Sequence, residues 1–261
     1  MANLYTYKNI NGLQIPIYNA EAFKKLQIAG KLAYDTLEYI APFVKVGVSS
    51  QQLDELCHNF IVQHNAIPAT LGYNGYPKSS CISLNYEVCH GIPNEKKLIE
   101  GDILNIDITT IVDGYYGDIS KMFSVGKISP KAQKLINITK ECLDASIKIL
   151  KPGISLVEIG EIIEKIAHKN NFSVVEDFCG HGIGHQFHQE PNVLHYANHN
   201  NNLILEEGMV FTIEPMINAG KKETKMLNNG WTAITKDFSL SAQFEHTIGI
   251  TKNGCVIFTQ K

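Results

Sequence analysis

The chain contains no arginine: all 23 basic residues are lysine, beside 26 acidic residues and a formal net charge of −3. Proteins that read a nucleic-acid sequence commonly use bidentate arginine contacts to the bases, and they carry basic runs that follow the phosphates. This sequence has neither feature. We therefore expect no specific nucleic-acid sequence among its partners.

Cysteine pairs and long apolar runs are also missing. The six cysteines are scattered, and none belongs to a Cys-x-x-Cys pair, so neither a disulfide framework nor a structural zinc site is indicated. Residues 1–15 lack the basic-then-apolar pattern of a secretory signal, and no stretch is long and apolar enough to span a bilayer. We expect a soluble cytoplasmic protein with reduced thiols and no membrane partner.

The sequence does have ample material for a core. Of its 261 residues, 44% are hydrophobic and 19% are charged, which is typical of a globular protein. Residues 1–18 are polar and rich in tyrosine without a clear period, and they predict an extended N-terminal arm. Residues 19–261 are expected to form a single domain.

One unit of helix, turn and helix occurs twice. A helix that begins after Asn19 leads to Lys45-Val-Gly-Val-Ser49, and a helix that begins at Ser129 leads to Lys151-Pro-Gly-Ile-Ser155. In both copies Gln or Glu follows the last serine by three residues, which is a capping box that starts a second amphipathic helix. The repeat predicts an α+β fold of two α,α,β halves related by a pseudo-twofold. Helices should cover one face of a mostly antiparallel, curved sheet.

Residues 101–123 lie between the two copies and have the pattern of a β-hairpin. The run Ile103–Ile111 is rich in β-branched residues, Asp113-Gly114 is a two-residue turn signal, and Tyr115–Phe123 returns.

The predicted turn fixes which residues of this hairpin face each other. Asp107 should lie opposite Ser120, and Asp118 opposite Thr109, so the two acids become diagonal neighbours on one face. Two carboxylates aimed at one spot repel each other unless a cation lies between them. The hairpin alone is compatible with two readings, the floor of a metal site and a solvated face with two ordinary acids.

Other metal-type side chains occur in unusual settings. Two acids lie in the apolar, strand-like runs Met209–Met216 and Gln243–Ile250, and no lysine is near them in the sequence. Acids rarely occupy such positions without a partner. Each could individually be a buried acid bonded to backbone, and each histidine a satisfied core residue. The four residues are His90, His181, Glu214 and Glu245.

Taken together, the motifs resemble those of the type I, bacterial methionine aminopeptidases, which are dimetal peptidases of the pita-bread fold. The matching strings are Val88-Cys-His-Gly-Ile-Pro93, Asn105-Ile-Asp107, Gly117-Asp-Ile-Ser120, Gly180-His-Gly-Ile-Gly184, Thr212-Ile-Glu-Pro-Met216 and Ala242-Gln-Phe-Glu-His-Thr-Ile248. The resemblance extends over roughly residues 20–258. It implies a monomeric hydrolase that removes the initiator methionine from nascent polypeptides when the second residue is small.

The resemblance also implies two divalent metal ions, whether Co, Mn, Fe, Ni or Zn. Asp118 and Glu245 would bridge the ions. Asp107 would complete the shell of one ion, and His181 with Glu214 that of the other. Such a shell, mostly of oxygen atoms, differs from a structural Cys/His zinc site.

Further residues acquire roles through the same resemblance. Glu214 would take a proton from the attacking water, His90 would contact the scissile amide and assist departure of the amine, and His188 would donate to the carbonyl oxygen. A methionine pocket, alternatively explained as plain core filling, would be formed by Tyr73, Tyr76, Cys81, Phe187 and Trp231.

Three alternatives remain open at this point. His181, His185 and His188 form an His-x-x-x-His-x-x-His cluster that could hold a single zinc ion, although four acids would then be unexplained. A proline-specific aminopeptidase or dipeptidase shares the five metal ligands. A non-catalytic binding protein of the same fold is the third alternative.

The loop Ala219–Met226 contains Lys221, Lys222 and Lys225. A lysine patch on an enzyme that acts on nascent chains could make a transient contact with the ribosome. A solvated loop is the plainer interpretation.

Overall fold

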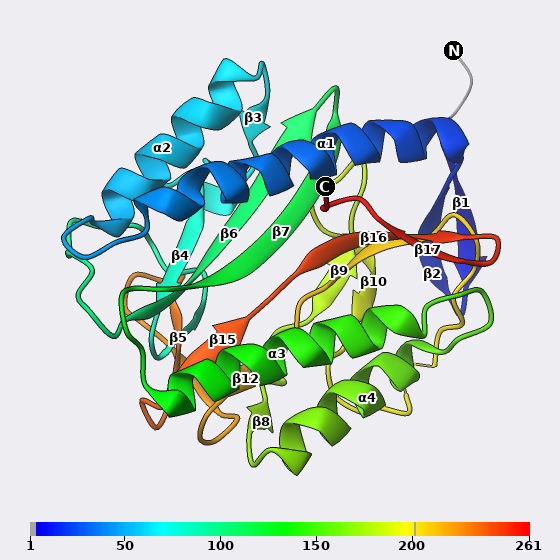
Figure 1. Ribbon diagram of the computed structural model, residues 1–261. Helices are drawn as coiled ribbons and strands as arrows, with labels where there is room; N and C mark the ends of the chain where they lie inside the picture. The colour runs from blue at the N-terminus through cyan, green and yellow to red at the C-terminus, as the bar shows by residue number, and fades with distance from the viewer. Residues whose placement is uncertain (1–3, 201) are drawn as a thin grey trace.

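The computed structural model describes residues 4–200 and 202–261, which form two helix pairs and a set of strands (Figure 1). The helices are α1 (Ala20–Ile40), α2 (Ser50–Gln63), α3 (Pro130–Lys148) and α4 (Leu156–Lys169), with 3₁₀ helices at Ala41–Phe43 and Tyr73–Gly75. The strands are β1 (Tyr5–Ile10), β2 (Leu13–Tyr18), β3 (Ile67–Pro68), β4 (Cys81–Leu84), β5 (Glu87–Cys89), β6 (Ile103–Val112), β7 (Tyr115–Ser124), β8 (Ser173–Val174), β9 (Gly180–Gly182), β10 (Gln189–Val193), β11 (Val210–Ile213), β12 (Met216–Asn218), β13 (Thr224–Met226), β14 (Ala233–Thr235), β15 (Ser241–Gln243), β16 (His246–Thr251) and β17 (Gly254–Ile257).

The predicted helix starts are confirmed. The Asn19 side chain accepts hydrogen bonds from the first backbone N–H groups of α1. Ser49 and Ser155 form the capping boxes that start α2 and α4, and the Ser129 side chain caps α3. Each cap satisfies N–H groups that the first helical turn leaves without a partner.

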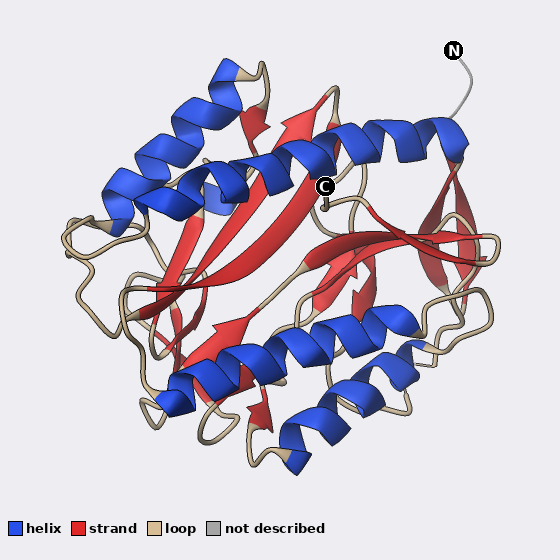
Figure 2. Cartoon of the chain, in the orientation of Figure 1, coloured by secondary structure: helices blue, strands red, loops and turns tan. Residues whose placement is uncertain are grey.

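The two helix pairs cover the strands as the repeat predicts. Helix α1 packs on β6 and β7, and α3 packs on β12 and β15. In Figure 2 both helices lie in front of these strands. Every strand pair within the described residues is antiparallel. Helix α1 comes very close to β7, because a Cβ at Gly117 would lie 2.4 Å from the backbone nitrogen of Gly30.

The predicted hairpin is confirmed in register. Strands β6 and β7 pair from end to end around Asp113-Gly114, whose positive φ values of 49° and 78° suit a tight turn. Asp107 lies opposite Ser120, and Asp118 lies opposite Thr109.

Two strand predictions were wrong. The runs Met209–Met216 and Gln243–Ile250 are each broken, the first between β11 and β12 and the second between β15 and β16. Strand β11 pairs with β16 in one sheet, while β12 pairs with β15 in another, so the chain changes sheets at both breaks. Pro215 has no N–H to give to a ladder, which favours the first break. Glu214 and Glu245 lie in these breaks, outside the strands.

The expected N-terminal arm contains regular structure. Its residues 1–3 lie outside the described part of the chain, and residues 5–18 form the β1–β2 hairpin around Asn11-Gly12. Both turn residues have positive φ. Because Asn-Gly is a strong hairpin signal, this hairpin could have been predicted from the sequence. The domain boundary at residue 18 stays a prediction.

The described cysteines are all unpaired, as expected for reduced thiols. Among residues 4–200 and 202–261, no helix has the length and apolar character needed to cross a membrane.

Candidate active site

One cavity of about 590 Å³ is lined by every residue to which the family resemblance assigns a role in the site. These residues come from both halves of the chain, and strands or strand ends support most of them. They are Tyr73, Tyr76, Cys81, His90, Asp107, Asp118, His181, Phe187, His188, Glu214, Trp231 and Glu245.

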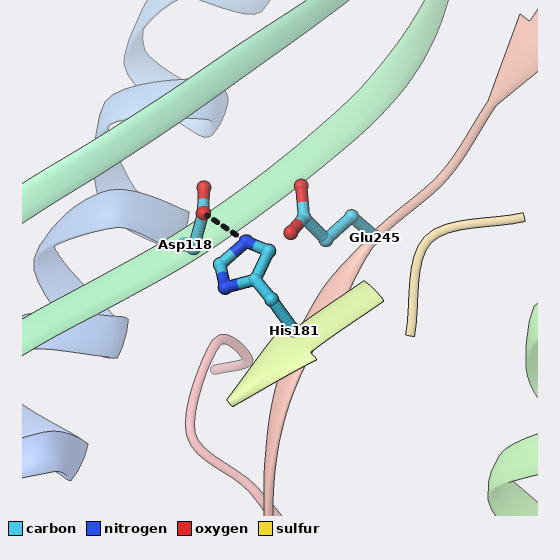
Figure 3. A group of neighbouring side chains, drawn as sticks. All are labelled: Asp118, His181 and Glu245. Carbon is cyan, nitrogen blue, oxygen red and sulfur yellow. Dashed lines mark ion pairs between the residues drawn. The ribbon is translucent and has the colours of Figure 1, made fainter. Parts of the chain in front are cut away.

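Three buried side chains converge in the cavity from three separate segments (Figure 3). Asp118 projects from β7, His181 from β9, and Glu245 from the connection between β15 and β16. A ligand atom from each lies within 4.8 Å of the other two. His181 Nε2 is also 3.6 Å from Glu214 Oε1 and 3.7 Å from Asp118 Oδ2.

The hydrogen bonds of His181 leave a lone pair directed at these acids. Its Nδ1 lies 3.1 Å from the carbonyl oxygen of Gly182, a group that only accepts, so Nδ1 carries the proton. The neutral ring then presents a bare Nε2 toward two carboxylates. Burial lowers the pKa of His181 to about 3, which disfavours a second proton. Lone pairs that face one another in this way need a cation between them.

The acids lack a compensating charge of their own. Burial, followed by repulsion from neighbouring carboxylates, raises the pKa values of Asp107, Glu214 and Glu245 well above their usual range. Burial raises that of Asp118 to about 7. Across the described residues, no lysine forms an ion pair with any of the four.

Asp107 offers a shielded oxygen atom that suits a metal ion. The residue as a whole is half-buried, but its Oδ1 atom is shielded from solvent and has no hydrogen-bond partner. An isolated buried carboxylate oxygen is costly, whereas a divalent cation would satisfy it. The donor set therefore fits metal ions that prefer oxygen with some nitrogen.

Three residues that the sequence analysis missed hold Glu214 in place. The Thr212 hydroxyl donates to Oε1 at 2.8 Å, and Gln243 Nε2 donates to Oε2 at 3.1 Å. The backbone N–H of Glu214 donates to His195 Nε2 at 3.1 Å. Thr212 and Gln243 each lie two positions from a metal-type acid, inside strings that carry the family resemblance, and that position was the available signal.

Hydrogen bonds between the two halves hold the bridging candidates. The backbone N–H of Asp118 donates to the Thr247 hydroxyl at 2.9 Å, and that hydroxyl donates to the Asp118 carbonyl at 2.8 Å. The N–H of Glu245 donates to the Ser120 carbonyl at 3.0 Å. These bonds join β7 directly to the segment around β16.

The other lining of the cavity is aromatic and apolar. The hydroxyl of the buried Tyr76 donates to the Gly91 carbonyl at 2.9 Å and lies 3.2 Å from the Ser80 carbonyl, and its ring meets Trp231 edge-to-face at 5.1 Å. Tyr73 packs on Phe187 at 4.7 Å. Aromatic edges of this kind make favourable contacts with a thioether.

His90 and His188 lie at the rim of the metal-type cluster. His90 has a positive φ of 54°, which is uncommon outside glycine, and its ring meets that of Phe178 edge-to-face at 5.7 Å. His188 stacks against His181 at 4.1 Å, and its Nδ1 lies 2.9 Å from the Tyr73 hydroxyl. Burial lowers the pKa of both histidines, so both rings are neutral near pH 7.

The alternative of a single zinc ion on three histidines is wrong in its geometry. Both ring nitrogens of His185 face tyrosine hydroxyls of the N-terminal hairpin, Nδ1 at 2.7 Å from Tyr18 and Nε2 at 3.2 Å from Tyr7. His185 is absent from the cavity lining, while His181 and His188 are present.

Known proteins match this chain over nearly its whole length. "Methionine aminopeptidase" of Escherichia coli (strain K12) is 53% identical over 249 residues, which are 95% of this chain and 94% of that protein. The crystal structure of methionine aminopeptidase from Rickettsia prowazekii has a TM-score of 0.93 at 52% identity and covers 94% of this chain and 100% of that one. The prolidase from Pyrococcus horikoshii shares the fold, with a TM-score of 0.73 at 24% identity, but this chain covers only 63% of it.

A model of metallopeptidase family M24 matches residues 24–252. This range includes every residue of the metal-type cluster and, apart from the first residues of α1, both helix pairs. The match agrees with the geometry, in which shielded carboxylates and one imidazole direct their lone pairs toward one another, as the ligands of a divalent cation do. The fold is the predicted pita-bread fold, and the chain belongs to metallopeptidase family M24.

Proposed function

We propose that this protein is a metal-dependent aminopeptidase that removes the initiator methionine from new polypeptides when their second residue is small. One observation carries the proposal: the buried metal-type cluster shares a single cavity with Tyr76, Cys81 and Trp231, which suit a thioether. The chain is also half identical, over nearly its full length, to proteins named for this activity.

The residues present fit two divalent ions. Asp118 and Glu245, whose ligand atoms lie within 4.8 Å of each other and of His181, would hold both ions, as the family resemblance implies. Asp107 would complete the shell of one ion and satisfy its lone Oδ1, and His181 with Glu214 would complete that of the other. Co, Mn, Fe, Ni and Zn are all compatible with this donor set.

When bound, such ions make water acidic enough to lose a proton near neutral pH and polarise a carbonyl group. The chain's own residues supply the rest. Glu214, its carboxylate oriented by Thr212 and Gln243, accepts the proton of the attacking water.

The two rim histidines act on the scissile amide. If the Tyr73 hydroxyl donates to Nδ1 of His188, the ring carries its proton on Nε2, from which it donates to the carbonyl oxygen as negative charge develops. His90, whose ring packs against Phe178, contacts the amide and assists departure of the new amine. The methionine side chain lies against the aromatic lining.

A comparison of two peptide classes tests the proposal. Purified protein supplied with Mn²⁺ or Co²⁺ should release methionine from Met-Ala-Ser much faster than alanine from Ala-Pro. Faster cleavage of Ala-Pro would favour a proline-specific enzyme instead. Inactivity on both, with metal bound, would favour a binding protein.

We also propose that the protein acts as a cytoplasmic monomer on nascent chains, resting transiently on the ribosome through the lysines of the loop at residues 219–226. Lys222 there pairs with Glu176 at 2.6 Å, and Lys225 lies 4.7 Å from the centre of the Phe238 ring. Reversal of Lys221, Lys222 and Lys225 to Glu should reduce co-sedimentation with ribosomes, and reversal of Lys24 on α1 should not. Equal co-sedimentation of both variants would dispose of the contact.

A further inference from the structure

The loop at residues 183–188, here called the site loop, joins β9 to β10 and lies between the N-terminal hairpin and the cavity. Phe187 and His188 line the cavity. On the other side, the backbone at Gly184 packs against the tyrosine at the end of β2, and a Cβ at Gly184 would lie 2.2 Å from the Tyr18 hydroxyl. The site loop is therefore in contact with both the hairpin and the reaction site.

The Tyr18 hydroxyl makes three hydrogen bonds to this region. It accepts the backbone N–H of His185 at 3.0 Å and the side-chain N–H of Gln189 at 2.8 Å, and it lies 2.7 Å from Nδ1 of His185. A phenol oxygen accepts twice and donates once. Because both acceptor positions are used, the Tyr18 O–H donates to Nδ1. Tyr18 is 3% exposed, so water cannot replace these bonds easily.

The bond from Tyr18 fixes the rest of the His185 ring. An imidazole that accepts at Nδ1 carries its proton at Nε2, and here Nε2 lies 3.2 Å from the Tyr7 hydroxyl, which can accept it. The Tyr5 ring stacks on the imidazole with centroids 4.0 Å apart and planes inclined by 19°. His185 is thus held at both nitrogens and on one face by three tyrosines of the hairpin.

The effect of this enclosure reaches His188, three residues further on. The His188 ring is held on the cavity side by Tyr73 and His181, through one hydrogen bond and two ring contacts. On the other side, Tyr18 accepts hydrogen bonds from the backbone of His185 and from the side chain of Gln189, residues that precede and follow His188 in the chain. A displacement of about 1 Å in a group that contacts the reacting atoms can reduce a rate about a hundredfold.

We propose that Tyr18 and His185 form a positioning clamp, through which the N-terminal hairpin holds the site loop and sets the place of His188 in the reaction. The expected effect of the clamp on kcat rests on the proposed function. The holding of the site loop by the hairpin rests on the hydrogen bonds alone. Tyr5 and Tyr7 complete the clamp by fixing the imidazole.

The substitution Tyr18→Phe keeps the ring and removes the three hydrogen bonds. We expect kcat for Met-Ala-Ser to fall at least about tenfold, with a smaller change in KM, because the displaced His188 acts on the developing charge. In a His188→Ala background the same substitution should change kcat less than about twofold, since the two residues act through one route. Tyr196→Phe, half-buried beside the core of the second half, is the control and should leave kcat unchanged.

Hydrogen–deuterium exchange reports on the clamp without reference to activity. Tyr18→Phe should speed exchange of the His185 amide, and Tyr5→Leu, which removes only the stacked ring, should do so to a smaller degree. If Tyr18→Phe does not fold, Tyr5→Leu replaces it in the comparison of kcat with and without the His188→Ala substitution. Unchanged exchange, or an equal loss of kcat with and without His188, would overturn the proposal. An inactive wild-type protein would refute the proposed function alone, and exchange would still decide the clamp.

Discussion

At the residue scale, the buried carboxylates of the site repel one another, and a cation bound between them would remove this repulsion. The Oδ1 atom of Asp107 is shielded and has no partner, and its neighbours are other carboxylates whose pKa values are raised by burial. Sequence spacing predicted that Asp107 and Asp118 share a face of one hairpin. It could not predict that Glu214 and Glu245 join them, since those contacts depend on long-range packing. The link came from the family resemblance.

Asp107→Asn should stabilise the metal-free protein while it weakens metal binding and methionine release. The amide removes a charge that the metal-free site cannot compensate, and each kcal/mol gained should raise Tm by about 2–4 °C for a chain of this size. Thermal unfolding with chelator and with excess Mn²⁺ measures both effects. Asp113→Asn, in the exposed turn of the same hairpin, is the control. A lower Tm for the metal-free Asp107→Asn protein would contradict this interpretation.

Metal affinity should fall as pH falls below about 7. Burial raises the pKa of Asp118 in the folded protein to about 7, so the folded metal-free site binds a proton there that an unfolded chain would not hold until lower pH. A cation must displace that proton, so acidification from pH 8 to pH 6 favours the protonated site over the metal-bound one. Calorimetric titration with Mn²⁺ across this range measures the change. A constant affinity would show that Asp118 is not a ligand.

Gln243→Leu should reduce kcat or metal affinity about ten- to a hundredfold with little loss of structure. The substitution removes the N–H that orients Oε2 of Glu214, and partners of metal ligands typically contribute effects of this size. Steady-state kinetics with metal analysis measures it. Gln133→Leu on the exposed side of α3 should be without effect. If both variants behave alike, Glu214 needs no such orientation.

At the element scale, the sequence predicted the elements whose structure depends on neighbouring residues in the chain. The β6–β7 hairpin was predicted to the residue because the turn signal sets the register. The breaks at Glu214 and Glu245 escaped prediction because apolar runs read as continuous strands, and the change from one sheet to another depends on distant partners. The breaks free both acids from the alternation of a strand, which lets each turn toward the cavity.

Removal of a capping box should change the stability of the protein without changing its activity. Ser155→Ala removes the side-chain oxygen at the N-terminus of α4 and should cost about 1 kcal/mol of unfolding free energy. Because α4 lies outside the cavity lining, kcat and KM should not change. Chemical denaturation together with the peptide assay measures both. A loss of activity in the folded Ser155→Ala protein would mean that α4 contributes to the site.

At the scale of the whole molecule, the site lies where two similar halves meet. Asp107 and Asp118 come from the first half, while His181, Glu214 and Glu245 come from the second. The repeated helix pairs made the two halves visible in the sequence. The contact of the N-terminal hairpin with the site loop was not visible, because Tyr18 and His185 are far apart in the chain and no sequence pattern links them. Only the folded chain brings them together.

Addition of metal to metal-free protein tests the central claim most directly, namely that these five residues hold divalent cations needed for hydrolysis. Methionine release from Met-Ala-Ser should be absent after chelation and return as Mn²⁺ or Co²⁺ is titrated in, and Asp118→Asn should stay inactive throughout. Release at full rate without metal, or by the Asp118→Asn protein, would contradict the account.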